Sequence, residues 1–369
     1  MIKILFFIDN LSGGGAEKVL IDLVNAMDKS RFGITVQTLY PDKNASRLGS
    51  GIKYKCCYKS AGIFNRYRMR LETALGLTYR FHIKDDYDIE CAYLECGATK
   101  IIAGSTNKKA KKLAWLHCDI RHRDWDLDSF VNKNAKWYKK FDRVVCVSET
   151  VKKSFIESFG NVAQADVLYN VVNDTDIIEK SGDPLPNDAV KRKFTAVLVG
   201  RMNTQKRIGR LLRAQRKLLD EGFDFDVWIV GEGPERQKLE AEIKALSLED
   251  HAFLFGFRKN PYPFMKAADL LVCSSIYEGF STFITEGLIH GKPILTTDVS
   301  GMRELLGDSE YGLIVPNDDD AFYEGLKRML SEQGLLEFCR ERSSERGKSF
   351  AEDKLVKHNE VFFEGLLKN

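Results

Sequence analysis

The sequence contains no hydrophobic run long enough to cross a membrane. None of its apolar stretches approaches the roughly 18 residues that a spanning helix needs. The opening run Met1–Ile8 is too short and too weakly flanked for a signal peptide, and it leads into glycines instead of a cleavage site. We therefore expect this run to be a buried strand and the protein to be cytoplasmic.

Paired cysteines are also missing. The eight cysteines show no C-x-x-C spacing of the kind that structural zinc sites use. In a reducing compartment such thiols stay unpaired and structural. The acidic run Asp85–Asp88 resembles a metal-binding Asp-x-Asp pair only superficially, and we expect it to be a solvated loop. No metal and no cofactor is therefore expected.

Net charge is small, at +3, but it is unevenly distributed. Residues 1–170 carry 28 Lys and Arg against 19 Asp and Glu, whereas the remaining residues carry 28 against 34. This asymmetry indicates that the N-terminal half faces an anionic partner. The mild overall balance and the lack of a nucleic-acid-binding module argue against nucleic acid as that partner.

What the sequence does contain is a repeated alternation of apolar strands and amphipathic helices. After the first strand, residues 16–27 place apolar side chains at helical spacing on one face. Further strands are expected at residues 34–39, 113–116, 143–147, 194–199, 225–230, 252–255, 269–273, 293–297 and 312–315. This alternation predicts an α/β fold with two doubly wound, Rossmann-like domains, whose ligand crevice lies at the carboxyl ends of the strands.

Turn-forming residues interrupt the pattern between the two series of strands. Pro184, Pro186 and a Ser-Gly pair before them are typical of a linker. The expected division is an N-terminal domain at 1–172, a linker at 173–190, a C-terminal domain at 191–345 and a helical tail at 346–369.

Two glycine-rich loops follow expected strands. Gly13-Gly14-Gly15 and Gly231-Glu232-Gly233 both lack the third glycine of a dinucleotide fingerprint, since Lys18 and Arg236 stand there. No G-x-x-x-x-G-K-[ST] sequence exists either, so NAD and P-loop nucleotide sites are excluded. The triple glycine remains either a tight turn or a set of backbone amides close to an anion.

Two cations follow the first strand of the second series. Arg201 follows Gly200 directly after the expected strand 194–199, and Lys206 stands just before an expected helix over 208–219. They either face the crevice or belong to a solvated basic loop, because more arginines follow on the helix.

The segment 274–286 carries the strongest signal. Glu278 lies in a loop, Ser281 or Thr282 is suited to cap a helix, and Glu286 falls about one turn inside that helix. Two acids that flank a helix N-terminus suit a ligand with phosphate in the middle and hydroxyls at both ends. A nucleotide sugar has this layout.

In order and spacing, these motifs resemble the large retaining GT-B family called glycosyltransferase family 4. The segments that carry the resemblance are residues 13–17, 115–117, 147–148, 200–206, 230–234, 255–257, 278–286, 291–293 and 312–316. The resemblance covers nearly the whole chain. It implies two domains that face each other across a donor and acceptor cleft, with a C-terminal helix returning toward the N-terminal domain.

The resemblance also implies roles for individual residues. The residues expected to act in catalysis are Arg201, Lys206, Glu278 and His117. Those expected to bind the donor are Gly14, Gly15, Arg201, Lys206, Phe257, Arg258, Glu278, Gly279, Phe280, Ser281, Thr282 and Glu286. Preorganised cations and amides would stabilise the leaving diphosphate without a metal. His117 considered by itself is as well suited to a structural role.

Two basic and aromatic segments of the N-terminal half are candidates for the acceptor side. Their residues are Arg66, Arg68, Arg70, Trp137, Lys139 and Lys140. Such surfaces lie on anionic lipid headgroups or are simply solvated helix faces. We expect a peripheral enzyme at the inner face of the plasma membrane.

The expected activity is retaining transfer of a hexose or N-acetylhexosamine from a nucleotide sugar to a saccharide or lipid-linked saccharide in bacterial surface polysaccharide synthesis. UDP is the preferred nucleotide from the frequencies in the family, and GDP is the alternative. The alternative functions are a non-catalytic nucleotide-sugar-binding module and a GT-B epimerase or phosphorylase.

Overall fold

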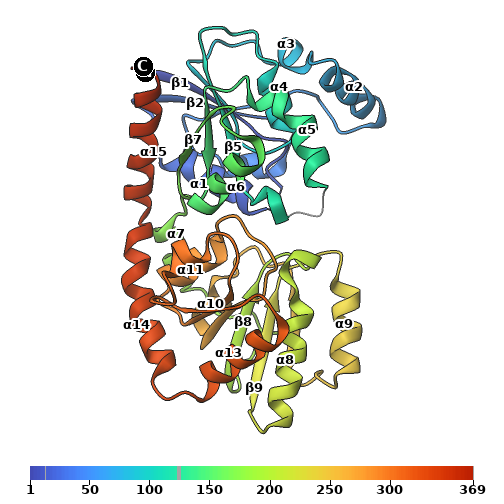
Figure 1. The fold of residues 1–369 in the computed structure, drawn as a ribbon, viewed down its shortest axis with the longest axis vertical. Helices are drawn as coiled ribbons and strands as arrows, with labels where there is room; N and C mark the ends of the chain where they lie inside the picture. The colour runs from blue at the N-terminus through green and yellow to red at the C-terminus, as the bar shows by residue number, and fades with distance from the viewer. Residues whose placement is uncertain (13, 123–125, 369) are drawn as a thin grey trace. The chain divides into compact units, whose positions relative to one another are not determined.

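The computed structural model describes residues 1–12, 14–122 and 126–368. Within these ranges the chain forms two compact α/β units (Figure 1). Unit 1 comprises Met1–Val172 together with Glu352–Asn369, and unit 2 comprises Asn173–Ala351. Each unit has its own parallel sheet, as the alternation of strands and helices predicts.

The sheet of unit 1 has the strand order β3-β2-β1-β4-β5-β6-β7. Its strands are β1 (Ile2–Phe7), β2 (Phe32–Thr38), β3 (Lys53–Cys56), β4 (Ile89–Ala92), β5 (Lys111–Leu116), β6 (Arg143–Cys146) and β7 (Gln164–Val167). Its helices are α1 (Gly15–Ala26), η1 (Lys43–Arg47), α2 (Ile63–Ala74), α3 (Thr78–His82), α4 (Gly97–Ala103), η2 (Ile120–His122), α5 (Leu127–Tyr138), α6 (Glu149–Phe159) and α15 (Glu352–Leu366). The strand order reverses between β1 and β4, which is where such sheets bind ligands.

The C-terminal helix α15 packs on unit 1, which confirms the expected return of the chain (Figure 1). The Phe363 ring meets Phe6 of β1 and Phe32 of β2 edge-on, with centroids 5.9 and 6.5 Å apart. Arg31 Nη1 donates to Glu360 Oε2 at 2.7 Å. Apolar contacts and an ion pair therefore join segments that are more than 300 residues apart in the chain.

The sheet of unit 2 has the strand order β10-β9-β8-β11-β12-β13. Its strands are β8 (Phe194–Val199), β9 (Phe225–Val230), β10 (Ala252–Gly256), β11 (Leu270–Cys273), β12 (Ile294–Thr297) and β13 (Leu313–Val315). Its helices are α7 (Asp174–Lys180), η3 (Thr204–Lys206), α8 (Ile208–Asp220), α9 (Arg236–Ala245), α10 (Tyr262–Ala267), α11 (Thr282–Ile289), α12 (Met302–Leu306), α13 (Asp319–Ser331), α14 (Leu335–Gly347) and η4 (Lys348–Phe350). Here the order reverses between β8 and β11, so the loops that follow these two strands start side by side.

The structure differs from the sequence-based division at 173–190 and at 346–351. The expected linker contains α7, which packs on α10 and α11 within unit 2. Asn173 caps this helix by accepting a hydrogen bond from the Asp176 amide at 2.7 Å. The Asn173-Asp174 pair, which is typical of turns, therefore begins a helix here. Residues 346–351 also belong to unit 2, and only α15 returns to unit 1.

None of the helices in the described ranges has the length and apolar character that crossing a bilayer requires. All eight cysteines are free thiols, and four of them, Cys91, Cys146, Cys273 and Cys339, are buried.

Candidate active site

The loop after β8 brings Lys206 next to Glu278. Asn203 caps the short helix η3, accepting from the Lys206 amide at 3.3 Å. This turn directs the Lys206 side chain toward the loop after β11, where Nζ lies 2.6 Å from Glu278 Oε1. The side chains of Lys206 and Glu278 are only 17% and 9% exposed. Lys206 and Glu278, to which the family resemblance assigns catalytic roles, therefore form a largely buried ion pair.

Hydrogen bonds fix the two loops to each other. Ser275 Oγ donates to Glu278 Oε1 at 2.7 Å, and Ser274 Oγ donates to the Lys206 carbonyl at 2.8 Å. Gln205 Nε2 donates to the Tyr277 carbonyl at 2.9 Å. No spacing rule predicts these roles of Ser274, Ser275 and Gln205 from the sequence. These hydrogen bonds hold the ion pair in one geometry.

Electrostatics keep the Lys206 ammonium charged. Burial by itself disfavours the Lys206 ammonium, but the Glu278 carboxylate outweighs burial and raises the pKa of Lys206. Burial also raises the pKa of the neighbouring Cys273 thiol, and the charge of Glu278 raises it further. Lys206 is therefore a cation near neutral pH, whereas Cys273 is a neutral thiol.

Glycines let the backbone approach closely around the pair. Gly301 has φ +79°, and a Cβ built on it would lie 2.5 Å from the Gly279 carbonyl oxygen. The loop after β12 therefore packs directly on the segment that holds Glu278. Only glycine combines this backbone conformation with this contact.

Helix α11 begins immediately after this segment. Ser281 is its N-cap residue but makes no side-chain capping hydrogen bond, so the first amides of the helix are not capped by that hydroxyl. Glu286 lies in the second turn and is 6% exposed; Tyr262 Oη donates to its Oε1 at 3.3 Å. Partly positive amides thus lie between the two acids, as the sequence predicts.

The other expected donor-binding residues of unit 2 differ in their surroundings. Arg201 is exposed, and no acid pairs with it in the part of the chain that the structure describes. Phe257, just after β10, is 69% exposed. Arg258 pairs with Asp188 of the expected linker. Arg201 and Phe257 are therefore accessible to a ligand, whereas Arg258 is engaged with Asp188.

In unit 1, the expected glycine loop precedes α1. Gly14 and Gly15 are exposed, and Gly15 is the first residue of the helix. Gly13 lies outside the described residues. The Glu17 carboxylate lies against Gly14, since a Cβ there would be 2.1 Å from Glu17 Oε2.

His117 follows β5 and is held by Glu95. Its backbone amide donates to Glu95 Oε1 at 2.6 Å, and the Cys118 amide donates to the same oxygen at 3.1 Å. Burial lowers the pKa of His117 despite opposing effects of Glu95 and the Tyr93 backbone, so the ring is neutral near pH 7. Its Nε2 is buried without a hydrogen-bond partner among the described residues. A neutral imidazole in this setting suits a hydrogen bond to a ligand better than charge stabilisation.

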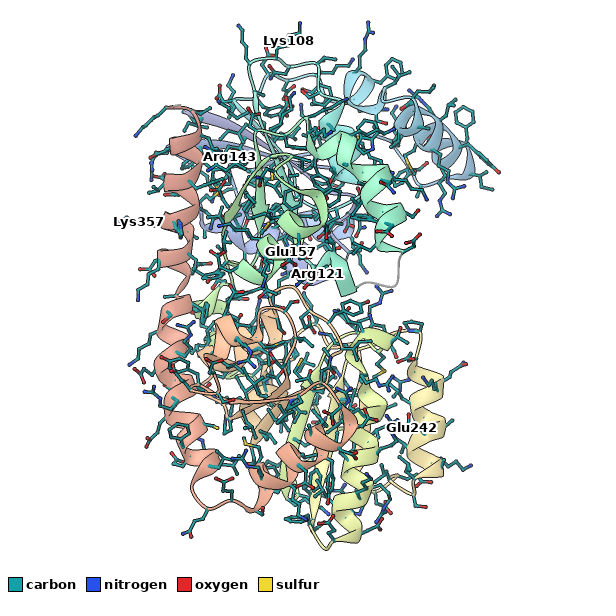
Figure 2. The ribbon with its side chains drawn as sticks, viewed as in Figure 1. Lys108, Arg121, Arg143, Glu157, Glu242 and Lys357 are labelled. Carbon is teal, nitrogen blue, oxygen red and sulfur yellow. The ribbon has the colours of Figure 1, made fainter. Side chains whose placement is uncertain are left out.

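Further along the same loop, Arg121 joins two elements of unit 1. Its Nη2 donates to Asp119 Oδ2 at 2.7 Å, and its Nη1 donates to Glu157 Oε2 of α6 at 2.6 Å (Figure 2). Since Asp119 is fully buried, this arginine ties the segment after His117 to helix α6.

Asp9, two residues after the end of β1, is a partly buried acid that no sequence motif singles out. Burial and, to a smaller extent, the charge of Glu17 raise the pKa of Asp9 to about 6. A hydrogen bond from the Ala98 backbone opposes this rise. Its Oδ1 has no hydrogen-bond partner in the described ranges. The folded state therefore binds this proton more tightly than the unfolded state does. The stability that Asp9 contributes is complete below about pH 4 and is lost as the pH rises through about 6.

Replacing Asp9 with asparagine should therefore stabilise the protein only where Asp9 is ionised. We expect the free energy of unfolding to rise by about 3 kcal/mol at pH 8 and to stay unchanged near pH 4. Urea denaturation at both pH values measures this difference. An equal gain at pH 4 and pH 8 would show that ionisation of Asp9 is not its cause.

The expected acceptor-side residues lie on two helices, and both helices pack on α4. Arg66, Arg68 and Arg70 are on α2; Trp137 is on α5, with Lys139 and Lys140 at its end. The ammonium groups of Lys136 and Lys140 lie 4.9 and 5.0 Å from the Trp137 ring centroid. Arg68 differs from the expectation of a free basic face, because its Nε donates to the buried Glu72 at 2.5 Å.

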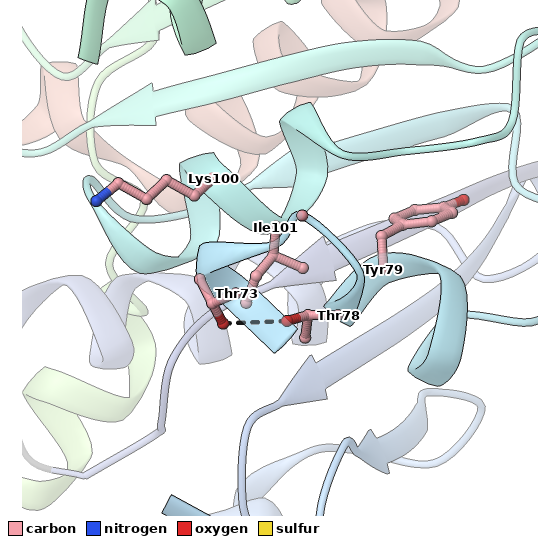
Figure 3. A pocket seen from close by; sticks show the side chains of 6 residues that line it. Thr73, Thr78, Tyr79, Lys100 and Ile101 are labelled. Atoms are coloured by element: carbon pink, nitrogen blue, oxygen red, sulfur yellow. Dashed lines mark hydrogen bonds between the residues drawn. The ribbon is translucent and has the colours of Figure 1, made fainter. Parts of the chain in front are cut away.

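A small hollow lies near α2, between α3 and α4 (Figure 3). Its lining residues are Thr73, Gly76, Thr78, Tyr79, Lys100 and Ile101, and the Thr73 and Thr78 hydroxyls are hydrogen-bonded at 3.0 Å. The hollow does not enclose space for even one water molecule, whereas small-molecule pockets enclose roughly 300 Å³ or more. It is therefore no candidate for the active site. Within the described ranges, no group of three or more His, Cys, Asp or Glu side chains is arranged to hold a metal ion.

Part of the sequence is similar to known glycosyltransferases. Residues 184–348 match the family model described as glycosyl transferases group 1. A Campylobacter jejuni protein, N-acetylgalactosamine-N,N'-diacetylbacillosaminyl-diphospho-undecaprenol 4-alpha-N-acetylgalactosaminyltransferase, is 32% identical over 237 residues. That match covers 63% of this chain and 63% of the relative, so the similarity spans less than two thirds of either protein.

Solved structures resemble the whole chain in fold. Anabaena HepE in complex with UDP and glucose has a TM-score of 0.76 at 17% identity, covering 99% of this chain and all of that one. Sucrose-phosphate synthase from Thermosynechococcus elongatus has a TM-score of 0.78 at 15% identity, covering both chains completely. At these identities the likeness establishes the fold alone.

Proposed function

Residues 184–348 form a domain of the glycosyl transferases group 1 family in a chain with the GT-B fold, and on this premise we propose that the protein is a retaining glycosyltransferase. It moves a hexose or N-acetylhexosamine from a nucleotide sugar to a saccharide or lipid-linked saccharide. The observation that carries this proposal is the buried pair of Lys206 and Glu278 beside the N-terminus of α11. It offers a fixed cation, a fixed carboxylate and backbone amides within one site.

We assign the parts of the donor to these groups. The Lys206 ammonium and the exposed Arg201 bind the diphosphate, together with the first amides of α11. Glu286 accepts hydrogen bonds from ribose hydroxyls, and Glu278 accepts them from the donor sugar. The base lies against Phe257, whose exposed ring is suited to stacking.

The proposed chemistry needs no metal and no separate base. The bond between the sugar C1 and the phosphate oxygen breaks, and negative charge develops on the diphosphate. Lys206 and Arg201 stabilise that charge. The acceptor oxygen bonds to C1 from the same face, which retains the configuration, and the proton of the acceptor hydroxyl passes to the departing phosphate oxygen.

Similar proteins support the proposed donor and acceptor classes. HepE binds UDP and glucose, which supports a UDP-linked donor here. The Campylobacter relative acts on a sugar carried by diphospho-undecaprenol, which supports a lipid-linked acceptor in bacterial glycan synthesis. We assign acceptor binding to unit 1, which bears the excess of basic residues, and we place the enzyme at the cytoplasmic face of the plasma membrane.

A donor screen tests this proposal. Purified protein is incubated with UDP- and GDP-linked sugars while thermal stability and nucleotide release are recorded. We expect one UDP-sugar to raise the melting temperature. We expect this shift to vanish in Glu286→Ala, because the ribose loses its acceptor, and to persist in Glu249→Ala, an exposed acid elsewhere in unit 2.

The other outcomes identify the alternatives. Stabilisation by a nucleotide sugar without release of nucleotide, even with acceptor present, would indicate a non-catalytic binding module. Conversion of the sugar without transfer would indicate an epimerase. No stabilisation by any nucleotide sugar, in protein shown to be folded, would overturn the proposal.

A further inference from the structure

Helix α2 directs its apolar side chains outward. Its large apolar residues, with Leu75 at its C-cap, are Ile63, Phe64, Tyr67, Leu71 and Leu75, and each is 62–78% exposed. At about 100° per residue these positions span an arc of about 120°, so they form one continuous stripe. Surface helices of soluble proteins turn such a stripe toward the core; here it faces away from the core.

The inner side of α2 carries a buried acid, Glu72, whose hydrogen bonds fix the orientation of the helix. Glu72, the only buried residue of the helix, accepts hydrogen bonds from Tyr58 Oη at 2.6 Å and Arg68 Nε at 2.5 Å. The His82 ring lies 2.7 Å from the same carboxylate. Rolling the helix to bury the stripe would break this buried network, which is costly. The outward stripe is therefore a stable feature of unit 1.

The surroundings of the stripe are strongly basic. Between Lys53 and Lys84 the chain has eight Lys and Arg residues and a single acid, Glu72, whose charge is already engaged. Of these cations, Lys55 pairs with Asp85. Arg66 and Arg70 are exposed beside the stripe and have no ion-pair partner among the described residues. The free charge next to the apolar stripe is thus positive.

We propose that α2 is a membrane-docking helix, which inserts its apolar stripe at the level of the headgroups of an anionic lipid bilayer. The helix lies parallel to the membrane surface, and Arg66 and Arg70 reach lipid phosphates beside the inserted side chains. Insertion removes the apolar stripe from water, and the anionic headgroups neutralise the positive charge beside it. This inference rests on the proposed function, because it names the surface through which unit 1 reaches a lipid-linked acceptor.

Vesicle binding by the full chain tests this inference. The purified protein is sedimented with vesicles of phosphatidylcholine alone or of phosphatidylcholine mixed with anionic phosphatidylglycerol, whose surface charge attracts basic helices. We expect binding to the anionic vesicles only. Phe64→Ser/Leu71→Ser should weaken this binding by about tenfold or more, because two apolar side chains no longer insert.

Charge variants and a control separate the two contributions. Arg66→Gln/Arg70→Gln should also weaken binding to anionic vesicles and make the remaining binding less sensitive to salt. The matched control is Val361→Ser on α15, which removes another exposed apolar side chain of unit 1 and should leave vesicle binding unchanged. Since all these positions are exposed, unaltered thermal stability confirms that the variants fold.

Two results would overturn the inference. One is a failure of the wild-type chain to bind anionic vesicles; the other is undiminished binding by Phe64→Ser/Leu71→Ser. If light scattering instead shows a dimer that this variant dissociates, in protein that does not bind vesicles, the stripe is a self-association surface. Donor stabilisation is measured in parallel, so vesicle binding without any response to nucleotide sugars would refute the transferase proposal and leave the docking helix intact.

Discussion

Replacing Lys206 with methionine should lower the rate of sugar transfer by about 10²–10³-fold, the usual effect of removing one preorganised group that stabilises developing charge. The same substitution should lower the free energy of unfolding by about 3 kcal/mol, because Glu278 is left as a buried and unpaired carboxylate. Nucleotide release in the presence of donor and acceptor measures the first effect, and urea denaturation measures the second.

A double variant separates the two effects. Lys206→Met/Glu278→Gln removes both charges, while the new side-chain amide oxygen can still accept the Ser275 hydrogen bond. We expect its stability to return to within about 1 kcal/mol of the wild type, since replacing both members of a buried pair is far less costly than removing one. Transfer should stay lost, because the diphosphate still lacks its cation. Wild-type turnover in Lys206→Met would contradict the proposed role of Lys206.

Much of the site could be predicted because it is local in sequence. Glu278, Ser281 and Glu286 stand within nine residues of one another, and their spacing relative to a helix N-terminus follows from helix geometry alone. Lys206 is distant in sequence, but it follows the strand beside β11, and parallel strands bring their carboxyl ends to one edge. Local spacing and sheet topology therefore place Lys206 and Glu278 at the same edge of the sheet, whereas their ion pair is visible only in the structure.

Other parts of the site depend on contacts that no local pattern encodes. Ser275 and Tyr262 are ordinary polar residues in sequence, and only the packed structure shows that they hold Glu278 and Glu286. Glu95 was missed for a further reason: it follows β4, a strand of four residues that contains the buried acid Glu90. A charged residue inside so short a strand leaves too few apolar residues for the strand to be recognised from the sequence.

The edge strands β3 and β7 could not be predicted either, because they are short and polar. Both are four residues long and only partly buried, with sequences rich in polar side chains, so they lack the continuous apolar run typical of central parallel strands. Helix α2 shows a related limit. Its periodicity indicates an amphipathic helix, but only the hydrogen bonds of Glu72 show which side faces inward.

Replacing Gly231 with alanine should lower the free energy of unfolding of unit 2 by about 3–5 kcal/mol and abolish donor binding. Gly231 has φ +149°, a conformation that side chains disfavour, and a Cβ there would lie 1.9 Å from the Gly200 carbonyl oxygen. Gly200 and Gly231 also donate backbone hydrogen bonds to Val230 and Gly256 at 3.0 and 2.9 Å. Any shift that relieves the clash therefore disturbs the ends of β8, β9 and β10 together, beside Lys206.

The matched control for this prediction is Gly222→Ala. Gly222 also has a positive φ, of +92°, but nothing lies within 4 Å of its Cβ position, so its replacement should cost only the backbone term of about 1 kcal/mol. Urea denaturation followed by the fluorescence of Trp228, the only tryptophan of unit 2, measures both variants. Both substitutions carry a similar backbone cost. The difference between their losses in unfolding free energy therefore measures the close contact between the loop after β9 and the loop after β8. Equal losses would mean that the loop after β9 can move away from Gly200, and the rigid glycine contact would then be no part of the donor site.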